Sequence, residues 1–410
     1  GIYEASDLKG WEADLRQNIF TFGKLENGIL IALDNLELAK QDLRKAKQDV
    51  IYNVASSYFN VIKTRELLKL FQDSLNMAGA HFDQVNAMQE QGIVAKNDVL
   101  RSEVAKISAE HNLIKARNAN EITASILNSA IGNKIDEPIN LKNMEFESLS
   151  NELPYTYSEL LNNAFENRPD IKQINIAGNI SDKNSRMAKA GMLPSITAQA
   201  SYGWRNTNYP VSAINYDATS WAITGAASWN LFDGFNIQSK IKEADAQYRE
   251  TLANKRAMEK AIELDVKQSY LEFGAANEMV KSSRKEVESA SENYDVAENR
   301  FKNGLGTNID VLDAQTVLTQ AKTNLLSSQH ELLLSLAKIE KSTGLSDLSK
   351  EDRAKQDRIY LEGYFKLIFL EGGFLGFIDK NGNKYDLYGT KSKELFQKIS
   401  RAGKEYNAPD

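Results

Sequence analysis

The sequence lacks cysteine, which excludes disulfides, thiolate-bound zinc, a catalytic thiol and a lipid-modified N-terminal cysteine. It has only six prolines among 410 residues, five of them between Pro138 and Pro210 and the last at Pro409. Because proline interrupts helices, the proline-free stretches 1–137 and 211–408 have room for very long ones. No run reaches the ~18 apolar residues that a membrane-spanning helix needs.

Charge and motif content exclude further classes of protein. The 50 basic and 56 acidic residues give a net charge of −6, which argues against nucleic-acid binding. No glycine-rich loop ending in Gly-Lys-Ser/Thr is present to hold a phosphate. The three histidines, His81, His111 and His330, lack the spacing of metal ligands or of a catalytic triad, so we expect them at solvated helix positions. We therefore expect neither an enzyme nor a bound cofactor.

The chain carries an internal repeat. Asn18-Ile-Phe20 recurs as Asn230-Leu-Phe232, and Asp98-Val-Leu100 recurs as Asp310-Val-Leu312. The two members of every pair are 212 residues apart, and one offset kept over so many positions indicates a duplication. Further pairs are Val54 and Val266, Ser57-Tyr58 and Ser269-Tyr270, Gly92 and Gly304, and Gly132 and Gly344.

Each copy has apolar residues spaced seven apart. This period keeps one seam of a helix facing a partner and predicts left-handed supercoiling. A stripe of small residues beside the last seam permits a second close contact. The seams are Val54, Val61, Leu68, Leu75 and Phe82; Val266, Phe273, Val280, Val287, Tyr294 and Phe301; and Val311, Leu318, Leu325, Leu332 and Ile339, with the small stripe at Ala314, Ala321, Ser328 and Ser335.

These seams predict two long helical hairpins. The stretch from Lys24 to Gln89 has about 66 residues and spans about 100 Å as continuous helix, and the second copy matches it from Ile237 to Phe301. Gly92 and Gly304 fit helix C-terminal caps at which the chain reverses. Four antiparallel helices per chain result; locally, an ordinary coiled-coil hairpin explains the pattern equally well.

Three other segments alternate with a period of two, which predicts strands over 11–19, 195–205 and 219–231. One face of each is apolar and the other small or polar, as in strands of a membrane barrel with lipid outside and water inside. A soluble, half-buried hairpin gives the same alternation. The aromatic residues expected to face lipid are Tyr202, Trp204, Trp221 and Trp229.

The sequence resembles the TolC-like family of bacterial outer-membrane efflux and secretion channels. The resemblance covers residues 11–344 and depends on the order and spacing of several short motifs. They are Asn18-Ile-Phe-Thr-Phe-Gly23, Asn230-Leu-Phe-Asp-Gly234, Tyr58 and Tyr270, Arg168-Pro-Asp170, and the two reversals Gly92…Asp98-Val-Leu and Gly304…Asp310-Val-Leu-Asp313.

The resemblance implies a mainly helical homotrimer that pools its strands into one outer-membrane β-barrel and its helices into a long periplasmic α-barrel. It implies a passive exit duct of a tripartite efflux or type I secretion system, lying in the outer membrane of a two-membrane bacterium. A periplasmic adaptor and an inner-membrane pump would dock at the helix reversals, Gly92, Gly304 and Gly306. The segments would be a first repeat over 1–137, a helical linker over 138–193, a second repeat over 194–344 and an extension over 345–410.

The resemblance also implies an aperture lined by Asp310 and Asp313, which a trimer presents as rings that attract cations. For Asp310, favourable interaction with the dipole at a helix N-terminus is an equal explanation. Asp98 matches a position that helps to hold such a tip closed. Here the chain departs from the family. The positions whose side chains would bond to Asp98 carry Phe301 instead of a tyrosine and Gly306 instead of an arginine.

Both ends of the chain raise further expectations. The first copy has a single strand where a complete copy has a hairpin, so either a first strand was lost before Gly1 or the barrel is incomplete. We favour the loss of a first strand, and with it a signal peptide. In the extension, Asn381-Gly382 predicts a two-residue hairpin turn, which fits better than a calcium loop because Lys384 and Thr390 stand where glycine and glutamate belong. A short helix is expected over 391–401. The alternative for the whole chain is a soluble coiled-coil scaffold or a pore-forming protein without pump partners.

Overall fold

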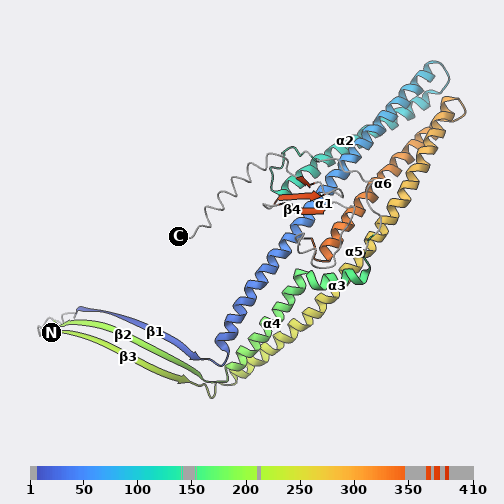
Figure 1. The fold of residues 1–410 in the computed structure, drawn as a ribbon. Coiled ribbons are helices and arrows are strands. Elements are labelled where there is room, and N and C mark those ends of the chain that lie inside the picture. The colour runs from blue at the N-terminus through green and yellow to red at the C-terminus, as the bar shows by residue number, and fades with distance from the viewer. Residues whose placement is uncertain are drawn as a thin grey trace. The chain divides into compact units, whose positions relative to one another are not determined.

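A computed structural model shows a mainly helical chain (Figure 1). It divides into two compact units, one of residues 1–43 and 169–259 and the other of residues 44–168 and 260–410. The structure describes residues 7–139, 141, 153, 155–209, 214–346, 366–370, 374–378 and 384–386.

The four predicted long helices are confirmed, and the duplication fixes their ends. Helices α1 (Lys24–Glu90) and α5 (Asn236–Lys302) each have 67 residues and start and end 212 positions apart. The return helices α2 (Lys96–Ile131) and α6 (Asn308–Ser342) keep the same offset at their first residues. Among the described residues, none of the helices has an apolar stretch that would span a lipid bilayer.

Both reversals have the same geometry. Gly92 and Gly304 take positive φ angles of 75° and 72°, which glycine adopts without the penalty of a Cβ atom. The amide of Ile93 donates to the carbonyl of Met88 at 2.9 Å, and that of Leu305 donates to Arg300 at 2.8 Å. This six-to-one bond is the Schellman motif, which satisfies a carbonyl that the ending helix leaves unpaired. The predicted glycine caps are confirmed in both copies.

The seven-residue seams form the contacts within the second unit. Val266, Val311 and Ile339 are fully buried, as are the small residues Ala314 and Ala321 beside them. Burying each Val or Leu side chain contributes about 1.5–3 kcal/mol, so packing along these seams, rather than helix propensity, stabilises such long helices.

Two shorter helices connect the copies. Helix α3 (Tyr157–Asn167) begins with a capping box between Thr156 and Glu159. Helix α4 (Pro169–Ala190) opens on proline, whose fixed φ suits the first turn and whose missing amide costs nothing there. Arg168 lies between the two helices, and its Nη1 donates to Asp265 Oδ2 at 2.6 Å and to the carbonyl of Ser342 at 3.1 Å.

The first unit contains an antiparallel sheet of order β1-β2-β3. Strands β1 (Asp7–Phe20), β2 (Ser195–Tyr209) and β3 (Ile214–Ser228) are confirmed, although β1 and β2 run beyond their predicted ends and β3 begins five residues earlier. A bulge between Asn18 and Phe20 shifts the register, so Phe20 rather than Ile19 pairs with Ile196.

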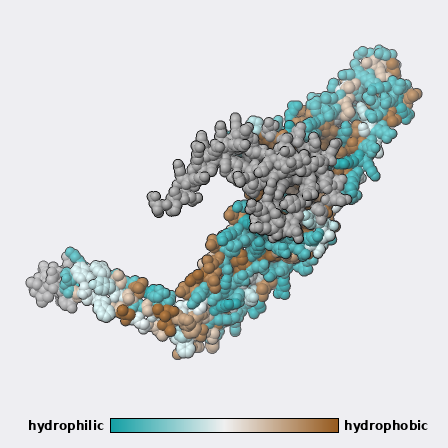
Figure 2. Space-filling model, viewed as in Figure 1, coloured by the Kyte–Doolittle hydropathy of each residue, from teal (hydrophilic) through white to brown (hydrophobic). Residues whose placement is uncertain are grey.

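The predicted end of the last strand at residue 231 was wrong, because β3 stops at Ser228. Trp229 therefore lies just beyond the strand, where its indole Nε1 donates to the carbonyl of Met192 at 3.1 Å. This side-chain bond joins the segment after β3 to the segment after α4. Figure 2 shows apolar residues gathered where the strands meet the helices.

The C-terminal extension contains a second antiparallel sheet of order β4-β5-β6. Its strands are β4 (Lys366–Leu370), β5 (Phe374–Ile378) and β6 (Lys384–Asp386). The antiparallel pairing of β5 with β6 confirms a hairpin, but the register of Ile378 with Lys384 leaves five residues between them, which does not fit the predicted two-residue turn. The turn at Asn381-Gly382 and the helix expected over 391–401 lie outside the described residues.

Candidate functional site at the helix reversals

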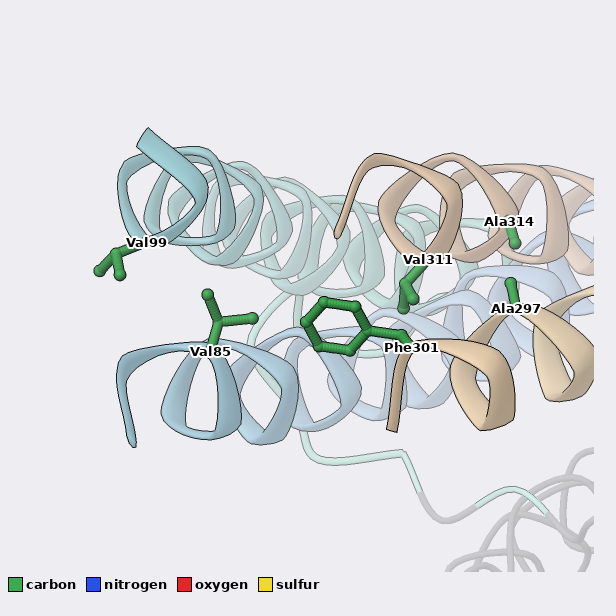
Figure 3. Close-up of a cluster of buried hydrophobic side chains, with 6 residues drawn as sticks. All are labelled: Val85, Val99, Ala297, Phe301, Val311 and Ala314. Atoms are coloured by element: carbon green, nitrogen blue, oxygen red, sulfur yellow. The ribbon is translucent and has the colours of Figure 1, made fainter. Parts of the chain in front are cut away.

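Side chains from all four long helices meet near the reversals. Val85 of α1, Val99 of α2, Phe301 of α5 and Val311 of α6 are buried in one apolar cluster, which also includes Ala297 and Ala314 (Figure 3). Phe301 stands where the family has a tyrosine that donates a hydrogen bond, and in this chain its ring packs in the apolar cluster. The cluster fastens the α1–α2 hairpin to the α5–α6 hairpin by apolar burial.

A buried polar group lies beside this cluster. The imidazole Nε2 of His81 lies 2.7 Å from Oδ1 of Asn308, and the hydroxyl of Ser102 donates to the same oxygen at 3.2 Å. The amide nitrogen of Asn308 donates to the carbonyl of Asp98 at 2.9 Å. Because an amide oxygen only accepts, Nε2 of His81 carries the proton in this bond. Asn308, the first residue of α6, is thereby held between α1 and α2.

The expectation of solvated histidines was wrong for two of the three. His81 is 5% exposed and His330 is 7% exposed, whereas His111 is exposed as expected. Burial lowers the pKa of His81, which the bond to Asn308 partly opposes, and burial with nearby Lys63 lowers the pKa of His330 to about 4. A sequence signal existed for His81, because Ser74, Ala78, His81 and Val85 form a second stripe at helical spacing and all four are buried.

Asp98 and Asp310 are equivalent in the two copies but have different surroundings. Asp310 forms a capping box, in which its Oδ2 accepts from the amide of Thr307 at 3.0 Å and its own amide donates to the Thr307 hydroxyl at 3.3 Å. These bonds to Thr307 hold the pKa of Asp310 below its ordinary value. The residue equivalent to Thr307 in the first copy is Ala95, which cannot cap. Asp98 instead contributes its main-chain carbonyl to the bond with Asn308.

A groove of about 300 Å³ lies between α5 and α6 near their reversal. Asp310 and Asp313 line one side of it, and Arg300 lies on the α5 side. Gly306 closes the groove near the reversal, where a Cβ atom would lie 3.1 Å from both Arg300 Cβ and the Phe301 nitrogen. A side chain at position 306 would therefore require Arg300 or the backbone at Phe301 to shift. The remaining lining residues are Asn293, Val296, Ala297, Ala314 and Val317.

The reversals themselves present apolar side chains to solvent. Ile93 follows Gly92 and is 60% exposed, and Leu305 follows Gly304 and is 73% exposed. Both are therefore available to a protein partner at the end of their hairpins.

In the first unit, the pairing register places the strand aromatics on one face of the sheet. Tyr202 pairs with Trp221, and Trp204 pairs with Trp11. Trp221 is 74% exposed. Residues on the opposite face of β1 include Glu12, Asp14 and Arg16, so one face of the sheet is apolar and the other polar. Trp229 lies outside the strands and does not share this placement.

Comparisons with known proteins agree with this architecture. The family described as Outer membrane efflux protein matches residues 7–133 and 160–345. The chain is 24% identical over 341 residues to the outer membrane protein TolC of Escherichia coli, covering 80% of this chain and 68% of that protein. It is 21% identical over 342 residues to the toluene efflux pump outer membrane protein TtgC of Pseudomonas putida, covering 82% of this chain and 68% of that protein. The fold matches the MtrE outer membrane channel of Neisseria gonorrhoeae in its open state with a TM-score of 0.70 at 19% identity, covering 83% and 81%.

Proposed function

Because this chain belongs to the outer membrane efflux protein family, we propose that three copies of it form the passive exit duct of a tripartite efflux or type I secretion system. The chain is an outer-membrane channel protein, and its family consists of transport channels that work with efflux pumps. The observation that carries the finer proposal is the two-faced sheet, whose described strands leave both edges open.

The sheet needs neighbours on both edges. Strands β1 and β3 each pair only with β2 among the described strands, so each leaves one edge of amides and carbonyls open. Open edges of 14 and 15 residues are unfavourable in lipid, where no water satisfies the backbone. The edge of β3 would pair with a strand of a neighbouring copy, and that of β1 with such a strand or with the strand expected before β1 in the chain. Closing three such sheets into one barrel would direct the polar face inward.

Aromatic residues near two levels of the sheet match the height of a membrane. Trp11 lies nine residues before Phe20 on β1, a separation of about 30 Å along a strand and about 20 Å across a bilayer at a tilt of about 45°. Outer-membrane barrels have an apolar band about 25 Å tall between two aromatic girdles. Leu15 and Ile223 pair with Ala200 on the apolar face between these levels. We expect lipid to cover this face.

The helices also leave complementary faces uncovered. Within the chain, α1 packs on α6, as the contact of Ser74 with Thr319 and the bond from Gln315 to the Ser74 carbonyl show. The duplication makes α5 the counterpart of α1 and α2 the counterpart of α6. Their equivalent faces are exposed and carry apolar residues. They include Leu100, Ile107 and Ile114 on α2 and Leu264, Leu271 and Val296 on α5. In a ring of three copies, α2 of one chain would cover α5 of the next.

The reversals would be the contact site for a periplasmic adaptor and, through it, an inner-membrane pump. Ile93 and Leu305 supply exposed apolar surface there, and Gly92, Gly304 and Gly306 set the backbone that presents it. In the trimer, Asp310 and Asp313 would form rings that attract cations.

The test is to purify the full-length chain from outer membranes in mild detergent, measure its mass by light scattering, and then record its conductance in a planar bilayer. We expect a trimer and ohmic conductance across the bilayer. A monomer, or a trimer that never conducts, contradicts the proposed duct.

A further inference from the structure

Two grooves near the reversals are related by the duplication, and among the described residues one of them is filled by a side chain of the same chain while the other is open. The groove between α1 and α2 contains Asn308, which contacts His81, Ser102 and the carbonyl of Asp98. At the equivalent positions, the groove between α5 and α6 is lined by Asn293, Ala314 and Asp310, and it stays open with a volume of about 300 Å³.

The duplication also identifies the residue that corresponds to the filling side chain. Asn308 is the first residue of α6, and its equivalent 212 positions earlier is Lys96, the first residue of α2. Lys96 is exposed in the chain. A neighbouring copy that repeats the contact between hairpins would therefore bring Lys96 to the open groove.

The charges of the two partners agree with this placement. The filled groove accepts a neutral amide and has Arg101 at the position equivalent to Asp313. The open groove has the carboxylates of Asp310 and Asp313, which suit an ammonium group. Arg300 is the cation on the opposite wall, where it donates to the carbonyl of Leu305 at 3.3 Å. The two carboxylates and the guanidinium of Arg300 together have a net negative charge, which attracts a second cation.

We propose that Lys96 of one copy enters the α5–α6 groove of the next copy, between Asn293, Asp310 and Asp313. The proposal rests on the trimer of the proposed function and identifies a specific contact within it. Lys96 then joins two hairpins of different chains, as Asn308 joins the two hairpins of one chain. Lys96 does so by an ion pair, whereas Asn308 does so by neutral hydrogen bonds.

The absence of cysteine makes the contact measurable. In the chain carrying both Lys96→Cys and Asn293→Cys, the two thiols occupy positions equivalent to Asn308 and His81, whose Oδ1 and Nε2 atoms lie 2.7 Å apart. Because cysteine is shorter than either side chain, a short bifunctional methanethiosulfonate reagent is used to bridge the two thiols. Treating the detergent-solubilised protein with it should yield covalent trimers on a non-reducing gel that return to monomers on reduction. A bond within one chain would leave a monomer. The control, Lys134→Cys with Asn293→Cys, places an equally exposed thiol beyond the end of α2 and should stay unlinked.

A charge exchange tests the ion pair. Lys96→Glu should lower the temperature at which the trimer dissociates, and adding Asp313→Lys should restore most of the loss. A preparation that is monomeric before cross-linking contradicts both the trimer and this contact. A trimer that conducts but stays unlinked in the Lys96→Cys, Asn293→Cys variant overturns this contact alone, as does a charge exchange without recovery.

Discussion

Arg44 and Gly344 are 300 residues apart in the chain, yet Nη2 of Arg44 donates a hydrogen bond of 2.9 Å to the carbonyl of Gly344. Nη1 of the same guanidinium donates to the carbonyl of Asn167 at 2.7 Å, and Gln48 donates to Gly344 at 3.0 Å. Helix α1 therefore satisfies carbonyls at the ends of both α3 and α6. Cationic donors at helix C-termini also oppose the negative end of the helix dipole.

Gly344→Ala should destabilise this junction. Gly344 has a φ of +72°, and a Cβ atom there would lie 2.8 Å from the nitrogen and Cα of Arg168. The left-handed backbone and the clash together should cost at least about 2 kcal/mol. The measurement is the denaturant midpoint of the helical circular dichroism signal. Gly79→Ala is the matched control, because Gly79 lies within α1 with nothing within 4 Å, and it should stabilise by about 0.5–1 kcal/mol. Equal midpoints for both variants would show that the backbone conformation of Gly344 and its closeness to Arg168 do not require glycine.

Ile223→Asp should block membrane insertion, whereas Thr224→Asp should not. The two residues are adjacent on β3 and point to opposite faces of the sheet, since successive side chains alternate. An aspartate toward lipid costs several kcal/mol near the bilayer centre, but one toward water costs little. Assembly into outer-membrane fractions, measured by heat-modifiable mobility on gels, distinguishes the two. Equal assembly of both variants would show that the apolar face does not meet lipid.

Acid should weaken the second unit through its buried histidines. An unfolded histidine binds a proton below pH 6.5, whereas His81 and His330 resist it in the folded chain because their pKa values are lowered. Their stabilising contribution is complete above pH 6.5 and falls as the pH drops towards about 4, the pKa of His330. Denaturant midpoints between pH 7.5 and 4.5 measure the slope. The variant with His81→Gln and His330→Gln should have a flatter slope; an unchanged slope would assign the effect to other groups.

Removing both aspartates of the groove, by Asp310→Ala with Asp313→Ala, should weaken cation selectivity in a planar bilayer. Arg300 and a lysine from the next copy together balance the two carboxylates, so removing both aspartates leaves each groove positively charged and reduces the attraction for cations. Asp310→Ala alone should also lower stability because it removes the capping box, whereas Asp313→Ala should not. Asp136→Ala with Glu137→Ala removes the same charge beyond α2 and serves as control. Unchanged selectivity in the Asp310→Ala, Asp313→Ala variant would remove these residues from the aperture.

The helices and their reversals could be predicted because their signals are local. The seams from Val266 to Phe301 and the glycines at 92 and 304 decide where each helix lies and ends, whatever packs beside it. The bond of His81 with Asn308 could not be predicted in this way, because it depends on which faces of two hairpins meet, and neither residue has a partner nearby in sequence.

The strands were less completely predictable. Alternation placed Tyr202 and Trp221 on one face, and their pairing agrees with it. The end of β3 depends on its partner, because Ser228 pairs with Ser195, the first residue of β2, and no residue of β2 is left to pair with Trp229. The bulge before Phe20 likewise leaves no mark in a two-residue period, because it arises from pairing with β2.

The matched 67-residue lengths of α1 and α5 limit how this chain can evolve. Inserting one heptad into α1 alone would move its reversal about 10.5 Å along the helix axis and separate His81 from Asn308. The insertion becomes tolerable when α2 lengthens by the same heptad and the second copy repeats both changes. Length variation in this chain should therefore come in sets of four compensating insertions, each a whole number of heptads.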